Sequence, residues 1–142
     1  MKKIAAAASL LLLTACGYGV DVNIADGGFR DGEFEGKSSV DELGATGHVK
    51  LSIASDRLTD VEFQVVDADG TVHDADYGKT AGEIVNQESY EKAQFSVDAE
   101  AKYAAQLLET NDLEQVDTIS GASLNHKTFE EAVLDALDKA RV

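Results

Sequence analysis

Hydrophobic and polar residues alternate one by one through two neighbouring segments, 48–53 and 58–66. A period of two is typical of a strand with one buried and one exposed face. Residues 55–57 form a turn between the two segments, and Asp69-Gly70 signals a second hairpin. A weaker alternation over 32–36 precedes them. The pattern predicts an antiparallel meander whose buried face carries Val49, Leu51, Ile53, Val61, Phe63 and Val65.

Beyond Gly82 the hydrophobic residues recur at spacings of three and four, which is typical of an amphipathic helix. The pattern predicts one helix over 83–95 and another over 97–110. Asn111-Asp112 should end the second helix, and 116–119 reads as a short strand.

A final helix is the clearest element in the chain. Thr128 and Glu131 have the spacing of a capping box, so the helix should begin there and run to residue 140. Strands followed by helices define an α+β fold, in which helices pack on the meander. The buried face of this helix should consist of Phe129, Ala132, Val133, Ala136, Leu137 and Ala140.

The first fifteen residues have the pattern of an export signal. Lys2 and Lys3 precede a small and apolar run over 4–13, which is too short to span a bilayer as a mature helix. The run ends in Leu13-Thr14-Ala15-Cys16, which resembles the bacterial lipobox. We therefore expect cleavage before Cys16, acylation of Cys16, and a lipoprotein held to a membrane outside the cytoplasm. An ordinary secretory signal or a buried N-terminal helix is the alternative.

The chain after this signal divides into a tether and one domain. Cys16 is the only cysteine, so no disulfide can form within the chain. Residues 17–28 contain several glycines and show no periodicity, which predicts a flexible tether. Residues 29–142 should then form a single domain with one core, since their number suits one.

The charge of the chain is strongly negative. Twenty-seven acidic residues stand against 12 lysines and arginines, a formal net charge of −15. Loss of Lys2 and Lys3 with the signal would make the mature chain more negative still. Such a surface excludes nucleic acid as a partner and opposes adsorption to anionic lipid. A protein partner would meet a negative surface, and its association would depend on salt.

Segment 117–123 carries the chemistry that the sequence suggests. Small residues and hydroxyls lie between an expected strand and a helix, an arrangement that suits a phosphate. Gly121 permits unusual backbone conformations, Ala122 allows close approach, and His126 and Lys127 add positive charge nearby. Many loops of this composition bind nothing, so spacing alone leaves both readings open.

The same segment, Asp117-Thr118-Ile119-Ser120-Gly121-Ala122-Ser123, resembles the attachment motif of the FMN-binding domain family. That domain occurs in the flavin subunits of sodium-pumping NADH:quinone oxidoreductases and in small extracellular electron-transfer lipoproteins. The resemblance runs from about residue 31 to residue 140 and is strongest to the short lipoprotein branch. It includes the opening segment 31–36 and the turn segment 56–61.

The resemblance implies a covalent cofactor. In the family, a magnesium-dependent flavin transferase uses FAD to esterify FMN onto the last hydroxyl of the motif, which is Ser123 here. Threonine is commoner at that position, and serine keeps the reactive oxygen. Asp117 matches the leading acid that the family associates with modification. The residues that would surround the phosphate are Ser120, Gly121 and Ala122.

A second family segment lies near the flavin ring, and its nearest match here is 79–84. Only Thr80 and Gly82 are retained from it, so the resemblance implies ring contacts for these two residues alone.

These features together predict an FMN-carrying lipoprotein that passes electrons between a membrane donor and an external acceptor. It would be a carrier more than an enzyme with its own substrate, because the chemistry belongs to the cofactor. One alternative is a flavin-free surface lipoprotein that acts as a binding or scaffolding module. Another is a flavin-dependent reductase with a small substrate of its own.

Other polar residues are expected to have structural roles. The acidic run 67–76 lacks the glutamate and flanking helices of an EF-hand, so it reads as a turn. The three histidines are scattered and should lie at the surface without a metal: His48, His73 and His126. The tyrosines expected as half-buried anchors are Tyr77, Tyr90 and Tyr103.

Overall fold

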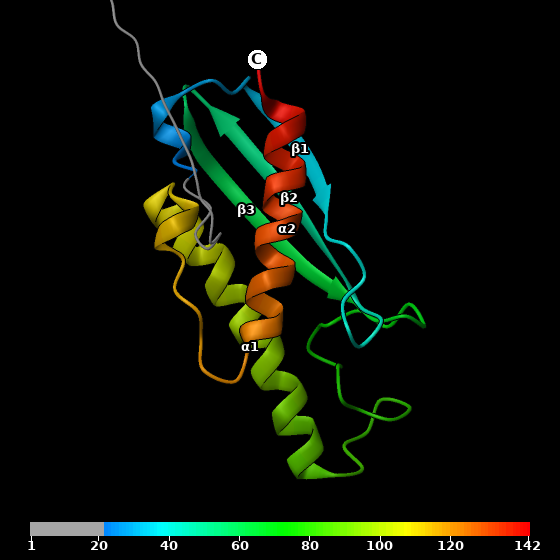
Figure 1. Ribbon diagram of the computed structural model, residues 1–142. Helices are drawn as coiled ribbons and strands as arrows, with labels where there is room; N and C mark the ends of the chain where they lie inside the picture. Colours follow the sequence, from blue (N-terminus) through cyan, green and yellow to red (C-terminus); the bar gives the residue numbers. More distant parts are fainter. Residues whose placement is uncertain (1–21) are drawn as a thin grey trace, which may run out of the picture.

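The computed structural model describes residues 22–142, so the expectations for the signal 1–15 and for Cys16 lie outside the described part. Three antiparallel strands form one sheet in the order β1-β2-β3: β1 (Gly32–Lys37), β2 (Thr46–Ala54) and β3 (Arg57–Val66). Two helices, α1 (Gln87–Thr110) and α2 (Ser123–Ala140), cover one face of the sheet (Figure 1). The expected α+β class is confirmed.

The turn between β2 and β3 follows the prediction. Ala54 pairs with Arg57, which leaves Ser55 and Asp56 as a two-residue loop. Both have positive φ angles, 53° and 59°, as a type I′ hairpin requires. The Asp31 carboxylate accepts a hydrogen bond from the Ser55 amide at 2.9 Å, which ties this loop to the start of β1.

The expected core is present. The inward positions of β2 and β3 are buried, apart from Phe63, which is partly exposed and packs edge-on against Phe129 with ring centroids 4.9 Å apart. Helix α2 lies across β1 and β2, and α1 lies along β3. The whole predicted stripe of α2 is inaccessible to solvent: Phe129, Ala132, Val133, Ala136, Leu137 and Ala140.

Helix α1 corrects the expectation of two helices. It is one helix of 24 residues, and it begins at Gln87 because the Asn86 side chain accepts a hydrogen bond from the Ser89 amide. The spacing of hydrophobic residues changes near Ser96 because the two halves of the helix pack against different parts of the protein. The second half buries one stripe of residues between Ala99 and Leu107, whereas the first half faces the irregular segment 67–86.

Helix α2 begins five residues earlier than expected, at Ser123. The prediction of a capping box at Thr128 and Glu131 was wrong. The Thr128 hydroxyl donates to the Leu124 carbonyl at 2.9 Å inside the helix, and the Glu131 carboxylate accepts from the Ser39 hydroxyl at 2.6 Å. The short strand at 116–119 was also wrong, because this segment pairs with no strand of the sheet and is held by side chains instead.

The expected domain boundary at residue 29 lies too late. Ile24, in the 3₁₀ helix Ile24–Asp26, is fully buried, and Val22 packs against the core. The Ile24 amide donates to the Asn111 carbonyl at 2.8 Å, and the Leu113 amide donates to the Val22 carbonyl at 2.9 Å. The segment 22–28 therefore belongs to the domain. It showed no periodicity because only one turn of it is anchored.

No helix within residues 22–142 combines the length and the apolar character that crossing a membrane requires.

Replacement of Gly36 by alanine should destabilise the domain. A Cβ atom at Gly36 would overlap the Ala132 carbonyl oxygen and the Ala136 amide nitrogen, so α2 would have to move away from β1. We expect a loss of about 1–3 kcal/mol or more in the free energy of unfolding, measured by urea denaturation. Glu35→Ala is the control, since Glu35 lies next to Gly36 and its own side chain is exposed. Equal stability of the two variants would contradict this packing.

Candidate functional site

A tight turn immediately precedes α2. The Ala122 amide donates to the Ile119 carbonyl at 2.9 Å, with Ser120 and Gly121 between them. Gly121 has a φ of 89°, the value that the third position of a type II turn requires. A Cβ atom there would lie 3.2 Å from Cε1 of Phe95, which is shorter than an ordinary van der Waals contact. Both backbone conformation and space therefore favour glycine, as the sequence suggested.

Tyr103, on the buried face of α1, holds this turn in place. Its side chain is fully buried, not half-buried as expected. The hydroxyl donates to the Ala122 carbonyl at 2.8 Å and accepts from the Ile119 amide at 2.9 Å. Burial raises the pKa of Tyr103, so the hydroxyl keeps its proton. One side chain of α1 thus satisfies a backbone group at each end of the turn.

His126 holds the segment before the turn. Its Nε2 donates to the Val116 carbonyl at 2.7 Å, and its Nδ1 lies 3.1 Å from a Glu130 oxygen. Its ring also packs edge-on against Tyr103, with centroids 5.1 Å apart. His126 is partly buried and both of its ring nitrogens have partners in the protein, so the expectation of a surface histidine was wrong. Lys127 is exposed, and no ion pair within residues 22–142 involves it.

Ser123 is the first residue of α2, and its side chain is exposed. Ala122 offers no side-chain cap, and the first intrahelical bond runs from the His126 amide to the Ala122 carbonyl at 3.1 Å. The amides of residues 123–125 therefore have no acceptor within the helix. Unpaired amides and the helix dipole favour an anion at this end. The hydroxyl of Ser123 is thus exposed at a helix end whose unpaired amides would favour an anion.

The other motif residues are nearby but less tightly placed. Ser120 is exposed in the turn, and the side chain of Asp117 is exposed before it. The Asp117 amide donates to the Gln106 side chain at 2.9 Å, which fixes its backbone to α1. In the described part of the chain, no hydrogen bond joins the Asp117 carboxylate to the turn.

Thr80 and Gly82 belong to a separate small hairpin. Thr80 and Glu83 exchange two backbone hydrogen bonds of 2.8 and 3.0 Å, around Ala81 and Gly82 with positive φ angles. The hairpin lies beside the first turn of α1, where the Lys79 ammonium is 5.9 Å from the ring centre of Tyr90. Among residues 22–142 no hydrogen bond connects it to the turn before α2. The hairpin and segment 117–123 are therefore not joined by any hydrogen bond in the described part of the chain.

A buried charged cluster was missed by the sequence analysis. His73 is buried, contrary to expectation; its Nδ1 lies 2.7 Å from Oε1 of Glu100 and its Nε2 lies 2.9 Å from Oδ1 of Asp67. The amide of Asn125, in the first turn of α2, donates to the same Glu100 oxygen at 2.7 Å. A signal existed in the sequence, because Glu100 precedes Tyr103 by three residues and Leu107 by seven on the buried stripe of α1.

The environment shifts the ionisation of this cluster. Burial raises the pKa of Glu100, and the hydrogen bonds from His73 and Asn125 oppose that shift only in part. Burial lowers the pKa of His73, but its hydrogen bonds to Glu100 and Asp67 outweigh burial and raise the pKa above its ordinary value. Burial and the nearby Asp67 raise the pKa of Tyr77, whose ring stacks on His73 at 3.8 Å, to about 12.

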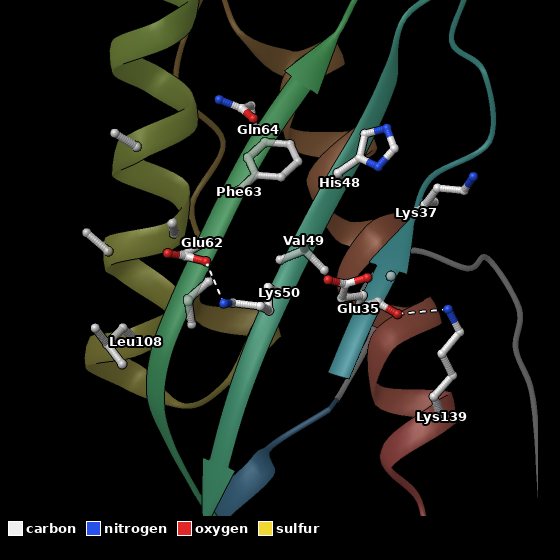
Figure 2. A pocket seen from close by; sticks show the side chains of 15 residues that line it. Glu35, Lys37, His48, Val49, Lys50, Glu62, Phe63, Gln64, Leu108 and Lys139 are labelled. Atoms are coloured by element: carbon white, nitrogen blue, oxygen red, sulfur yellow. Dashed lines mark hydrogen bonds and ion pairs between the residues drawn. The ribbon is translucent and has the colours of Figure 1, made fainter. Parts of the chain in front are cut away.

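Two hollows accompany these residues. A cavity of about 90 Å³ lies beside the cluster and is lined in part by Leu43, His73, Tyr77 and Asn125. It is too small for a flavin ring, since ligand pockets usually exceed roughly 300 Å³. A second hollow, an open groove of about 1020 Å³, lies between the exposed face of the sheet and α1 (Figure 2).

Two of the three lysines that line this groove have partners for their ammonium groups. Lys50 lies 3.3 Å from Glu62, and the Lys139 ammonium donates to the Glu35 carbonyl at 2.8 Å (Figure 2). Within residues 22–142 no group of three histidine, cysteine or acidic side chains is arranged to hold a metal ion.

Comparison with known proteins adds information on the fold. No family model matches the sequence, and no curated protein sequence matches it. The chain is similar in structure to the CPE2226 protein from Clostridium perfringens, known from a crystal structure, with a TM-score of 0.60 and 16% sequence identity. The match covers 79% of this chain and 88% of the other. At this identity the likeness concerns the fold alone.

Removal of the Tyr103 hydroxyl should loosen the turn before α2. Tyr103→Phe leaves the Ile119 amide and the Ala122 carbonyl without a buried partner, so we expect a loss of about 1–3 kcal/mol in the free energy of unfolding. Amide hydrogen exchange at Ile119 should also accelerate. Tyr90→Phe is the control, because its hydroxyl bonds the Ala75 carbonyl at an exposed site. A Tyr103→Phe variant with normal stability and normal exchange would contradict this role.

Proposed function

We propose that this chain is a lipid-anchored flavoprotein that carries FMN on Ser123 in phosphoester linkage and transfers electrons outside the cytoplasm. The observation that carries the proposal is the exposed Ser123 hydroxyl at the uncapped start of α2, directly after the Ser120-Gly121-Ala122 turn. A phosphoester there would replace the missing cap with an anion.

The residues of the turn fit a phosphate. Three first-turn amides have no acceptor in the helix. Lys127, four residues beyond Ser123, offers a cation on the same face of the helix one turn later. Gly121 is exposed and has no side chain, so its backbone is approachable. Ala122 is only 1% exposed, and its amide and carbonyl are bonded within the protein, so it would support the turn and not contact the phosphate. In this role the chain's own residues neutralise and orient the phosphate, and bound FMN would supply the redox chemistry.

The flavin ring would lie largely outside the protein core. The cavity near the first turn of α2 has only about 90 Å³ of space. Phe95 lies directly against Gly121, and 44% of its surface is exposed. An apolar ring at this position offers a surface against which a flavin attached to Ser123 can rest. An exposed ring suits a carrier, because redox partners must come close to it.

Two covalent attachments would then serve the same need. Acyl chains on Cys16 would keep the protein at the membrane, and the ester would keep the flavin on the protein. A tether holds the effective concentration of a ligand high whatever its intrinsic affinity, which matters where a dissociated cofactor is lost. The partners required are a flavin transferase, an electron donor and an electron acceptor.

A flavin-free binding module is the second candidate. The observation in its favour is the separation of the Thr80–Gly82 hairpin from the attachment turn, with no hydrogen bond between them in the described residues. On this reading the domain keeps the fold of a carrier without a cofactor.

The variants of Ser123 test the proposal. Co-expression of the chain with a flavin transferase should add one FMN, seen by intact mass and by fluorescence that survives denaturation. Ser123→Ala should abolish the label, since only the hydroxyl can form the bond, and Ser123→Thr should retain it. Ser120→Ala should only weaken labelling, and Asp117→Ala should slow it without unfolding the domain.

Three outcomes separate the alternatives. A parent protein that stays colourless with an active transferase would favour the flavin-free module. Label that persists in Ser123→Ala would place the flavin on another hydroxyl. Loss of label in a Ser123→Ala variant that unfolds would be uninformative by itself, so the thermal midpoint of each variant is measured alongside.

Anchoring is tested separately. Cys16→Ser removes the acyl acceptor, so the protein should leave the membrane fraction or remain unprocessed at its full mass. Fractionation of cells followed by intact mass measures both. Normal abundance of this variant in the membrane fraction at the processed mass would contradict lipid anchoring through Cys16.

A further inference from the structure

The cluster of His73, Asp67, Glu100 and Asn125, in which His73 and Glu100 are buried, joins three parts of the fold. His73 lies in segment 67–86, which contains no helix and no strand of the sheet. Glu100 belongs to α1, and Asn125 belongs to the first turn of α2. Segment 67–86 and this first turn lie at the same end of the molecule (Figure 1). The cluster is the point at which they meet.

Few other contacts hold segment 67–86 to the helices. The Gln94 side chain donates to the carbonyls of Asp74 and Tyr77 at 3.0 and 2.9 Å, and the Tyr90 hydroxyl donates to the Ala75 carbonyl at 3.2 Å. These donors are partly exposed, whereas Glu100 is only 2% exposed and His73 9%. Because water competes least at the cluster, its hydrogen bonds matter most for holding the segment.

The geometry of the cluster requires a proton. A neutral imidazole has one donor and one acceptor nitrogen, yet both nitrogens of His73 face carboxylate oxygens, at 2.7 and 2.9 Å. With no added proton, one nitrogen lone pair would point at a carboxylate. A single proton shared between His73 and Glu100 removes this conflict, whether it lies on the imidazole or on the carboxyl group.

The charges around His73 all favour retention of this proton. Asp67 faces it from the end of β3, Glu100 from α1, and the Tyr77 ring from segment 67–86 itself. Asn125 is the neutral neighbour from α2, and Asp41 from the β1–β2 loop lines the adjoining cavity. No lysine or arginine of the described residues pairs with the cluster.

We propose that this cluster is a proton-operated latch, which holds segment 67–86 and the first turn of α2 against α1 while it keeps the shared proton and releases them when the proton leaves. Release would open the wall of the small cavity, since His73 and Tyr77 line it on one side and Leu124 and Asn125 on the other. If the proposed function holds, the same latch also positions the turn that carries Ser123.

The direction of the pH dependence follows from the folded-state ionisation. The pKa of His73 and the pKa of Glu100 both lie above their ordinary values in the folded protein. A group whose pKa is raised by folding stabilises the fold below its unfolded pKa and loses that contribution as pH rises through its folded pKa. The latch is therefore closed in acid and near neutrality and opens on the alkaline side of the ordinary histidine range.

Amide hydrogen exchange of the whole chain tests the latch without any flavin. Protection of segment 67–86 and of the His126 amide, the first amide of α2 that is bonded within the helix, should be lost together as pH rises, after correction for the intrinsic effect of pH on exchange. Protection of β2 should persist over the same range. The ring of His73, followed by NMR, should titrate at the same midpoint, above the ordinary histidine value.

Glu100→Gln is the decisive variant. It keeps an oxygen for the Asn125 amide but removes the buried charge, so the midpoint for loss of protection should fall. His48→Gln is the matched control, because His48 is exposed on the outer face of the sheet, and its profile should equal the parent's. A parent whose protection does not change with pH would overturn the proposal, and so would a midpoint that Glu100→Gln leaves in place. If Glu100→Gln fails to fold, the NMR titration of His73 in the parent decides. Since these readouts need no cofactor, absence of flavin labelling would count against the proposed function alone.

Discussion

Helix α2 packs against β1 and β2 so closely that Gly36 has no room for a side chain. Its buried stripe supplies much of the core, and its solvent side binds the strand edge, where the Asp135 carboxylate accepts from the Lys37 amide at 2.9 Å. Because α2 cannot shift along the sheet, the position of its first residue is fixed as well. The candidate site depends on this constraint, since Ser123 is that first residue.

The second anchor of the site comes from α1. Tyr103 reaches from α1 to both ends of the turn before α2, and His126 returns from α2 to the segment before it. These contacts let an irregular, partly exposed segment keep a defined backbone without belonging to the sheet. A turn held in this way presents the Ser123 hydroxyl in one position at the start of α2.

Negative charge dominates the protein, and the Glu100 carboxylate lies in its interior. A buried glutamate is costly unless it has partners, and Glu100 has His73 and Asn125. The hydrogen bonds that offset the desolvation of Glu100 also connect α1 to segment 67–86 and to the first turn of α2. In the proposed latch, this connection depends on one shared proton. In a chain with a net charge of −15, acidic side chains have few positive partners, so His73 is an important partner for both Glu100 and Asp67.

The sequence by itself determined the three strands of the sheet, the buried stripe of α2 and the need for glycine at Gly121, because these follow from local periodicity and local backbone geometry. The motif Asp117–Ser123 was also visible from sequence, as a resemblance. Only the tertiary structure decided that α1 is continuous, that Ile24 belongs to the core, and that His73 is buried. Each of these depends on a partner far away in the chain: segment 67–86 for the first half of α1, Asn111 for Ile24, and Glu100 for His73. Periodicity reports which face of a segment avoids water, but it does not report which distant group lies on the other side.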